Sequence, residues 1–334
     1  MKYFKLFALL ATCSLLFVAC NKDEAPEQKI QNTPTPDYAQ RLTKASEQLS
    51  ETFAQMDTQE LKQLSDSLPE GSLKTLLEGM VDTFGGGSFH LGPDTFAKVS
   101  QLLAINWDVC EEGITIPYDG VNYTIRISSD TVDEVVVRTL TIDKDGEAYI
   151  SISSYRVDGV FYGDVIVNGN TIKLSYERVT AHSRINTVTV IKAGSKTPLI
   201  EISTNLVDNL TLPNIINGEV VCYADVKIKL LNGGFIIDGH IKDVSVMLQD
   251  AVAMANINMN GATEEACSAL ADKFNENAIM TLSSSAAYLG EIYLCPVLKE
   301  DSENYTLAFL AFSSAFGDKP LNLNELFINL IKML

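Results

Sequence analysis

Five glycine-containing turns, each between two strand-like segments, constrain the fold of this chain most strongly. Asp-Gly and Asn-Gly pairs supply the positive φ that tight hairpin turns require. Strands joined by such short turns must be antiparallel neighbours. The chain from about Ile114 onward therefore predicts a long antiparallel meander. The turns are Asp119-Gly120, Asp145-Gly146, Asp158-Gly159, Asn168-Gly169-Asn170 and Asn232-Gly233-Gly234.

The segments between these turns alternate apolar and polar residues with a period of two, which is the period of a strand. For example, Ile172 and Leu174 share one face while Lys173 lies on the other. One face of the sheet is therefore expected to be buried and the other wet. Near Lys242-Asp243 the apolar phase slips, which predicts a bulge or a strand crossing. The expected strands are 121–128, 134–142, 147–157, 160–167, 171–180, 185–192, 199–207, 220–231, 235–248, 278–283, 288–298 and 305–313.

Helices are expected before, within and after the meander. Apolar residues at three- and four-residue spacing predict a helical region at 38–106 that packs on the sheet. In the β-meander domain, 107–334, helices are expected at about 250–277 and at 322–334, where an apolar stripe should dock on the body. The result is an α+β fold. A meander this long usually curls into a half-barrel or barrel, which limits its exposed edges.

The N-terminus combines a basic start with an apolar run from Leu6 to Val18, and the small Ala19 precedes Cys20. This pattern resembles the type II signal peptide and lipobox of bacterial lipoproteins. The resemblance implies that residues 1–19 are removed and that the Cys20 thiol is acylated, for example with palmitate, so that a lipid bilayer becomes the partner. The run is shorter than the ~20 residues of a spanning helix. Polar residues and prolines at 20–37 predict a flexible tether.

Three charged residues directly follow the proposed anchor: Lys22, Asp23 and Glu24. A lysine followed by two acids at this place resembles the surface-export signal of Bacteroidota lipoproteins. The resemblance implies an outer-membrane protein displayed on the cell surface. A solvated linker would have a similar composition, so an anchor that faces the periplasm stays open as an alternative.

The charge balance excludes one class of partner. Residues 1–19 carry two lysines and no acids, so their removal lowers the count of basic residues from 25 to 23 against 43 acids and leaves a net charge of −20. Nucleic-acid binding depends on lysines and arginines that neutralise phosphates. We therefore expect no nucleic acid as partner, and we interpret the acidity as solubility outside the cell.

Four cysteines remain after Cys20: Cys110, Cys222, Cys267 and Cys295. An exported protein can pair them, and four cysteines allow three connectivities. No two lie at the CxxC spacing of zinc or redox motifs. Cys222 and Cys295 lie in strand-like apolar runs, where a buried thiol behaves as a small hydrophobe. Free thiols are favoured.

No motif for catalysis, a cofactor or a metal is found. The three histidines, His90, His182 and His240, are widely separated and lack the HExxH spacing of zinc hydrolases. No GxSxG nucleophile motif is present. Carboxylates are abundant, so a glycosidase-like pair stays open on composition.

Two tripeptides, Asp66-Ser67-Leu68 and Asp130-Thr131-Val132, resemble O-glycosylation sites of exported Bacteroidota proteins. The resemblance implies glycans on Ser67 and Thr131. Thr131 is expected in a turn before Glu134, where a glycan would fit.

These observations favour a surface-exposed, non-catalytic binding or accessory lipoprotein whose ligand is a glycan, a hydrophobic molecule or another envelope protein. One alternative is a carrier of lipid, which requires a deep apolar cavity in the curved sheet. Another is a hydrolase of polysaccharide or peptide, which requires two carboxylates at working separation or a nucleophile beside a base. An assembly protein with unpaired edge strands is a further alternative.

Overall fold

A computed structural model describes residues 38–56, 59–84, 112–284, 287–300 and 302–312. The chain divides into a unit of residues 1–36 and a unit of residues 37–334, and all described residues belong to the second. The expected signal peptide, the tether and the helix at 322–334 therefore lie outside the described residues.

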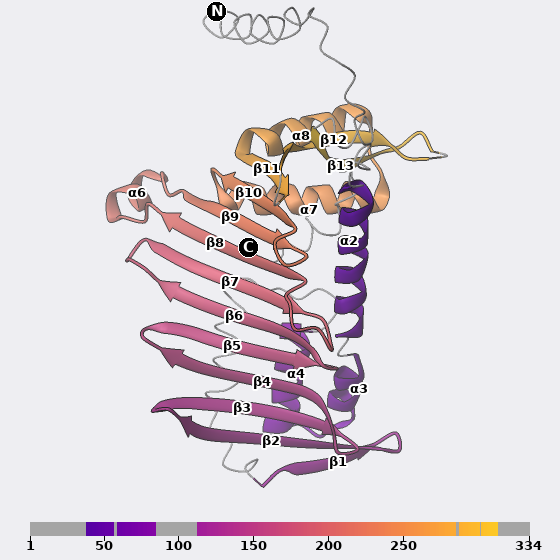
Figure 1. The fold of residues 1–334 in the computed structure, drawn as a ribbon, viewed down its shortest axis with the longest axis vertical. Helices are drawn as coiled ribbons and strands as arrows, with labels where there is room; N and C mark the ends of the chain where they lie inside the picture. The colour runs from indigo at the N-terminus through magenta and orange to yellow at the C-terminus, as the bar shows by residue number, and fades with distance from the viewer. Residues whose placement is uncertain (1–37, 57–58, 85–111, 285–286, 301, 313–334) are drawn as a thin grey trace, which may run out of the picture. The chain divides into compact units, whose positions relative to one another are not determined.

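The second unit is built on one antiparallel sheet of thirteen strands whose spatial order is their order in the chain (Figure 1). This confirms the predicted meander and the α+β class. Along the part of the chain that the structure describes, β1 pairs only with β2 and β13 only with β12, so the sheet is open and the barrel alternative was wrong. The strands are β1 Ile114–Tyr118, β2 Val121–Val132, β3 Val135–Lys144, β4 Glu147–Val157, β5 Val160–Val167, β6 Asn170–Arg178, β7 Ser183–Ile191, β8 Ile200–Asp208, β9 Cys222–Leu230, β10 Phe235–Ile241, β11 Ala278–Ser284, β12 Ala287–Leu298 and β13 Tyr305–Phe312.

The predicted turns adopt the backbone conformation that their sequences require. At Asp145-Gly146 the two φ angles are 50° and 85°, and Asp158-Gly159 repeats these values. A further tight turn, at Asp133-Glu134, has φ of 50° and 67° although it contains no glycine. That missing glycine explains why the sequence placed the end of β2 four residues too early.

The alternation of burial along the strands follows the predicted pattern. Ile172 and Leu174 are buried while Lys173 between them is exposed. The pairing keeps one face continuous from strand to strand, since Ile142 pairs with Ile150 and Ile150 with Val167, all buried. The sheet therefore has a core face, on which helices pack, and an outer face.

The expected strand at 235–248 needs a correction. Strand β10 ends at Ile241, and helix α7 begins at Val244. Asp243 caps this helix, because its carboxylate accepts hydrogen bonds from both the backbone N–H and the hydroxyl of Ser245. The phase slip in the sequence is thus the change from a strand period to a helix period. The two bulges of the sheet lie elsewhere, at Ile142/Asp143 and at Leu282/Ser283.

Six helices accompany the sheet in the described residues. Those before the sheet and those after β10 match the expected helical regions, although the helix pair after β10 starts earlier than residue 250. Helix α6, between β8 and β9, was not expected. They are α2 Tyr38–Gln55, α3 Gln59–Ser67, α4 Ser72–Phe84, α6 Leu212–Asn217, α7 Val244–Asn260 and α8 Glu264–Asn277. Of the expected 38–106 region, residues 85–106 lie outside the described part.

Helices α2 and α3 cross the sheet roughly at right angles to the strands (Figure 1). They run against the strand order, from β10 at Tyr38 to β3 at Glu60. Helix α2 has 18 residues and is therefore about 27 Å long. This length matches the roughly 24 Å between β10 and β5, which lie five places apart in the sheet. The contacts that mark this path are Tyr38 with Phe235, Glu51 with Lys192, Gln55 with Asn168, and Glu60 with Lys144.

Helices α7 and α8 pack on the last strands and use asparagines to complete the backbone ladder. The Asn258 side chain donates to the carbonyl of Leu307 and accepts from its N–H. Asn275 makes the same pair of bonds with Leu294. Because an amide side chain has the donor and acceptor of a peptide group, each asparagine stands in for a missing strand residue. Both backbone hydrogen-bonding groups of Leu307 in β13 are thereby bonded to the side chain of Asn258.

Candidate functional site

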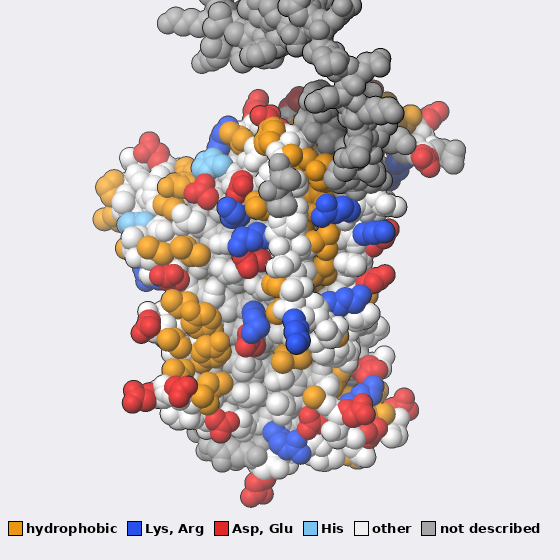
Figure 2. Space-filling view, in the orientation of Figure 1, with side chains coloured by type: hydrophobic (Ala, Val, Ile, Leu, Met, Phe, Trp, Pro, Cys, Tyr) orange, Lys and Arg blue, Asp and Glu red, His pale blue; other side chains and the backbone are white. Residues whose placement is uncertain are grey.

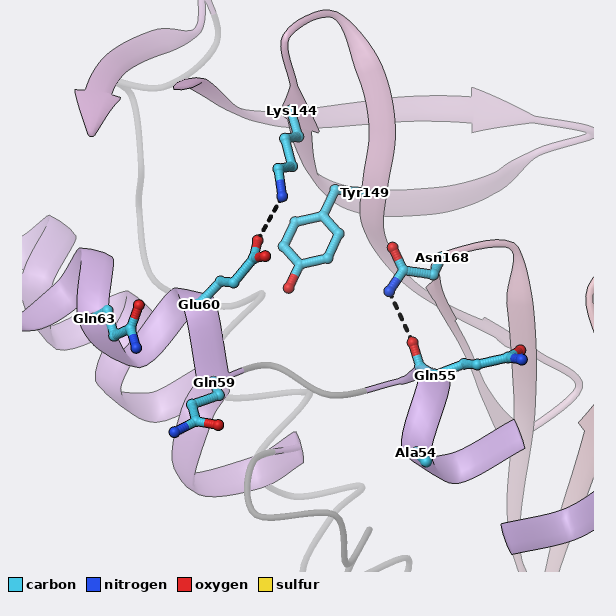
Figure 3. A pocket seen from close by; sticks show the side chains of 8 residues that line it. All are labelled: Ala54, Gln55, Gln59, Glu60, Gln63, Lys144, Tyr149 and Asn168. Atoms are coloured by element: carbon cyan, nitrogen blue, oxygen red, sulfur yellow. Dashed lines mark hydrogen bonds and ion pairs between the residues drawn. The ribbon is translucent and has the colours of Figure 1, made fainter. Parts of the chain in front are cut away.

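A pocket of about 380 Å³ lies where the helical layer meets the turns of the sheet (Figure 3). This volume is at the small end of the range for ligand pockets. Its walls come from the end of α2, from α3, from the β3–β4 hairpin and from the turn after β5. The lining residues are Ala54, Gln55, Gln59, Glu60, Gln63, Lys144, Tyr149 and Asn168.

An ion pair forms one side of this pocket. Lys144 Nζ lies 2.7 Å from Glu60 Oε2, and the Tyr123 hydroxyl donates to the same oxygen at 3.2 Å. The hydrogen bond that Lys144 donates to Glu60 raises the pKa of Lys144 above its ordinary value. Burial, followed by the charge of Glu60, raises the pKa of Tyr123. These raised pKa values favour the ammonium form of Lys144 and the neutral phenol of Tyr123 at neutral pH.

A bulge directs Tyr149 into the pocket. Ile142 pairs with Ile150 and Asp143 pairs with Ala148, which leaves Tyr149 as the extra residue of β4. An extra residue of this kind re-aims its side chain. The ring is only 7% exposed, and Lys144 Nζ lies 5.9 Å from its centre. Figure 3 shows the ring between the Lys144–Glu60 pair and the Asn168–Gln55 hydrogen bond.

Amides form the remaining polar lining. The Asn168 side chain donates to the backbone carbonyl of Gln55 at 2.7 Å, which fixes the turn after β5 to the end of α2. Gln59 and Gln63 lie one helical turn apart on α3. Amide side chains donate and accept at once. The lining therefore suits a neutral ligand with many hydroxyl groups better than an ion or a lipid chain.

The outer face of the sheet carries a second, shallow depression, lined by residues of β8, β9 and β10. It holds two carboxylates, each with a cationic or basic partner: Asp225 with His240 at 2.8 Å and Asp238 with Lys227 at 3.5 Å. All four side chains are about half exposed. Figure 2 shows Lys and Asp/Glu side chains interspersed on this face. Solvated, paired carboxylates are poor general acids.

The anchor and export residues, Cys20, Lys22, Asp23 and Glu24, lie outside the described residues. The two expected glycosylation residues are exposed. Ser67 ends α3, and its hydroxyl donates to the carbonyl of Leu64 at 2.6 Å. Thr131 lies within β2 and not in the turn, because the strand extends to Val132.

The cysteines and histidines within the described part do not form a site together. Cys222, Cys267 and Cys295 are free thiols, and burial raises the pKa of each, which disfavours the reactive thiolate. His182 and His240 are separate, each within 3.0 Å of an aspartate. His90 and Cys110 lie outside the described residues.

Sequence reasoning missed the pocket residues. Glu60 and Gln63 face away from the apolar stripe of a short amphipathic helix, where any solvated residue would look the same. Lys144 directly precedes the predicted turn at Asp145-Gly146, where a solvated lysine is common. Tyr149 had one available signal, because it interrupts the alternation of β4, where two successive residues are buried.

Comparison with protein-family models, curated proteins and solved structures gave no match. No helix in the described ranges is long and apolar enough to cross a membrane. Within the same ranges, no three His, Cys, Asp or Glu side chains are grouped as metal ligands would be.

Proposed function

We propose that the protein is a non-catalytic binding lipoprotein of the bacterial envelope, held by acylated Cys20 and displayed on the cell surface. Its ligand is a neutral, hydroxyl-rich glycan that binds beside Tyr149. The observation that carries this proposal is the pocket lining, in which one buried aromatic ring is surrounded by amides and a neutralised ion pair. Amides hydrogen-bond to neighbouring hydroxyls, and a ring supports the apolar face of a sugar.

The lining also supports ligand binding rather than catalysis. Among the described residues of the lining, Glu60 is the only carboxylate, and Lys144 neutralises it. A glycosidase uses two carboxylates across the scissile bond. The lining residues that the structure describes include no serine, cysteine or histidine that would serve as a nucleophile or base.

A lipid carrier is supported less well. That function requires an apolar cavity between sheet and helices. Where α2 to α4 cover the sheet, large side chains fill the space, with Met56, Leu61, Leu64 and Leu77 all fully buried. Both depressions described above have charged or amide linings.

Two measurements test the proposal. Mass spectrometry of the N-terminal peptide from bacterial membranes should show acyl groups on Cys20, and protease added to intact cells should digest the protein.

A panel of neutral oligosaccharides should bind the full-length protein saturably. Gln63→Leu should weaken this binding, whereas Gln48→Leu, on an exposed part of α2, should not. A Cys20 without acyl groups would refute the proposed lipid anchor. The absence of binding to every oligosaccharide tested would refute the proposed class of ligand.

A further inference from the structure

The loop between β8 and β9 presents six large aliphatic side chains to solvent, and four of them lie in or next to helix α6. Its helix α6 has no buried residue. Leu212 and Ile216 are 70% and 74% exposed, and Leu210 and Ile215 are about half exposed. Figure 2 shows hydrophobic side chains gathered over α6. We call these four residues the apolar tip.

Several backbone groups of this loop form hydrogen bonds within the loop itself. The Asn209 side chain accepts from Val221 N–H and donates to the carbonyl of Glu219. Thr211 caps α6 through Asn214 N–H, and the Asn214 side chain donates to the carbonyl of Asn209. At the other end, the N–H of Gly218 bonds back into the helix. These bonds reduce the number of polar groups that the loop would leave unpaired on leaving water.

The part of the loop that carries the apolar tip lacks charge. From Asn209 to Gly218 no residue is ionisable, and the first charge is Glu219. Asp208 at its base is paired with His182 at 3.0 Å and lies 3.9 Å from Arg184. An uncharged, internally bonded apolar tip fits the boundary between headgroups and acyl chains.

We propose that the apolar tip inserts into the surface of a lipid bilayer and forms a second membrane contact. The inference rests on the proposed anchoring at Cys20, which keeps the body near a membrane. Residues 20–37 are 18 residues that can reach about 60 Å when extended, so the tether lets the tip meet the bilayer. Six exposed aliphatic side chains on one loop are few for a stable protein interface, which uses roughly 20–30 residues a side.

The test uses the full-length protein, isolated from bacterial membranes, in vesicles of phosphatidylcholine with brominated acyl chains. In all variants Trp107 is replaced by phenylalanine, so that it does not contribute to the emission. Ile216→Trp and, in a separate variant, Leu212→Trp then serve as the fluorescent reporters. Val252→Trp is the matched control, because Val252 is 65% exposed on α7, away from the loop. Both loop reporters should lose roughly half of their emission to the bromine, since the boundary lies within reach of the chains. The control should keep its emission.

Two results would overturn the inference: loop reporters as bright as the control, or equal quenching at all three positions. A protein partner on the tip would give the first result, because these vesicles contain no other protein. Failure of the anchor is seen separately, as an N-terminal peptide without acyl groups. The fluorescence would still report on the loop, because an unprocessed chain keeps the apolar run Leu6 to Val18 to hold it on the vesicle.

Discussion

Glu60 and Lys144 lie 84 positions apart in the chain, and their side chains meet at 2.7 Å on the wall of the pocket. The contact joins α3 to the end of β3. Both side chains are substantially exposed, at 51% and 37%. An exposed ion pair contributes little to stability. Its main effect is therefore to neutralise the charge of Glu60 and to fix the two side chains in the wall of the pocket.

Replacement of Lys144 should therefore separate binding from folding. Lys144→Met should change the free energy of unfolding by less than about 1 kcal/mol. It should weaken glycan binding about tenfold, because Glu60 is left as an unpaired charge beside a neutral ligand. Urea unfolding and calorimetric titration measure the two effects. Lys196→Met, at an exposed turn, is the control. A large loss of stability without loss of binding would contradict this role.

The asparagine that stands in for a strand residue should matter for stability. Asn258→Ala removes both side-chain bonds to Leu307 and leaves a partly buried peptide group without its partners. We expect a loss of about 2 kcal/mol in the free energy of unfolding. Asn256→Ala, on the exposed side of α7, should change it by less than about 0.5 kcal/mol. Equal effects would show that the ladder bonds do not carry the difference.

The turn after β2 should be improved by glycine. Glu134 has a φ of 67°, a conformation that costs a residue with a side chain about 1 kcal/mol. Glu134→Gly should therefore raise the free energy of unfolding by up to about 1 kcal/mol. Glu147→Gly, in the first position of β4, should lower it instead, because glycine weakens a strand. Chemical denaturation distinguishes the two signs.

The buried carboxylate of Asp250 depends on its one cation. Its side chain is 2% exposed, Oδ1 lies 2.5 Å from Lys273 Nζ, and Oδ2 has no hydrogen-bond partner among the described residues. Lys273→Met should cost about 3 kcal/mol of stability, because an uncompensated charge stays buried. The double variant Asp250→Asn/Lys273→Met should regain a large part of that loss. No recovery in thermal or urea unfolding would mean that the charge is not the cause.

Acid should loosen the base of the α6 loop. The hydrogen bond with His182, followed by that from the N–H of Leu210, holds the pKa of Asp208 below its ordinary value of 3.8. A carboxyl whose pKa is lower in the folded state stabilises fully above the unfolded value and loses this effect as the pH falls through the folded value. His182→Ala should therefore move the pKa of Asp208 upward, as NMR titration of the carboxyl carbon would show. An unchanged pKa would rule out His182 as the main cause.

Local rules were sufficient for the meander but not for the pocket. Asp-Gly turns and alternation determine strand pairing within a few residues, as at Asp145-Gly146. The Glu60–Lys144 contact depends instead on where α2 and α3 cross the sheet, which no local pattern encodes. The expected strand at 235–248 is too long, because the period of two of a strand changes to the period of a helix near Asp243. Asp243 was not recognised as the cap of that helix.

The structure of the full-length protein with the oligosaccharide that it binds most tightly tests the central claim most directly. The account predicts sugar density beside Tyr149, with hydrogen bonds to Gln59, Gln63 or Asn168 and with every glycosidic bond intact. Density in the outer depression between Asp225 and Asp238, or a cleaved sugar in either place, would contradict it.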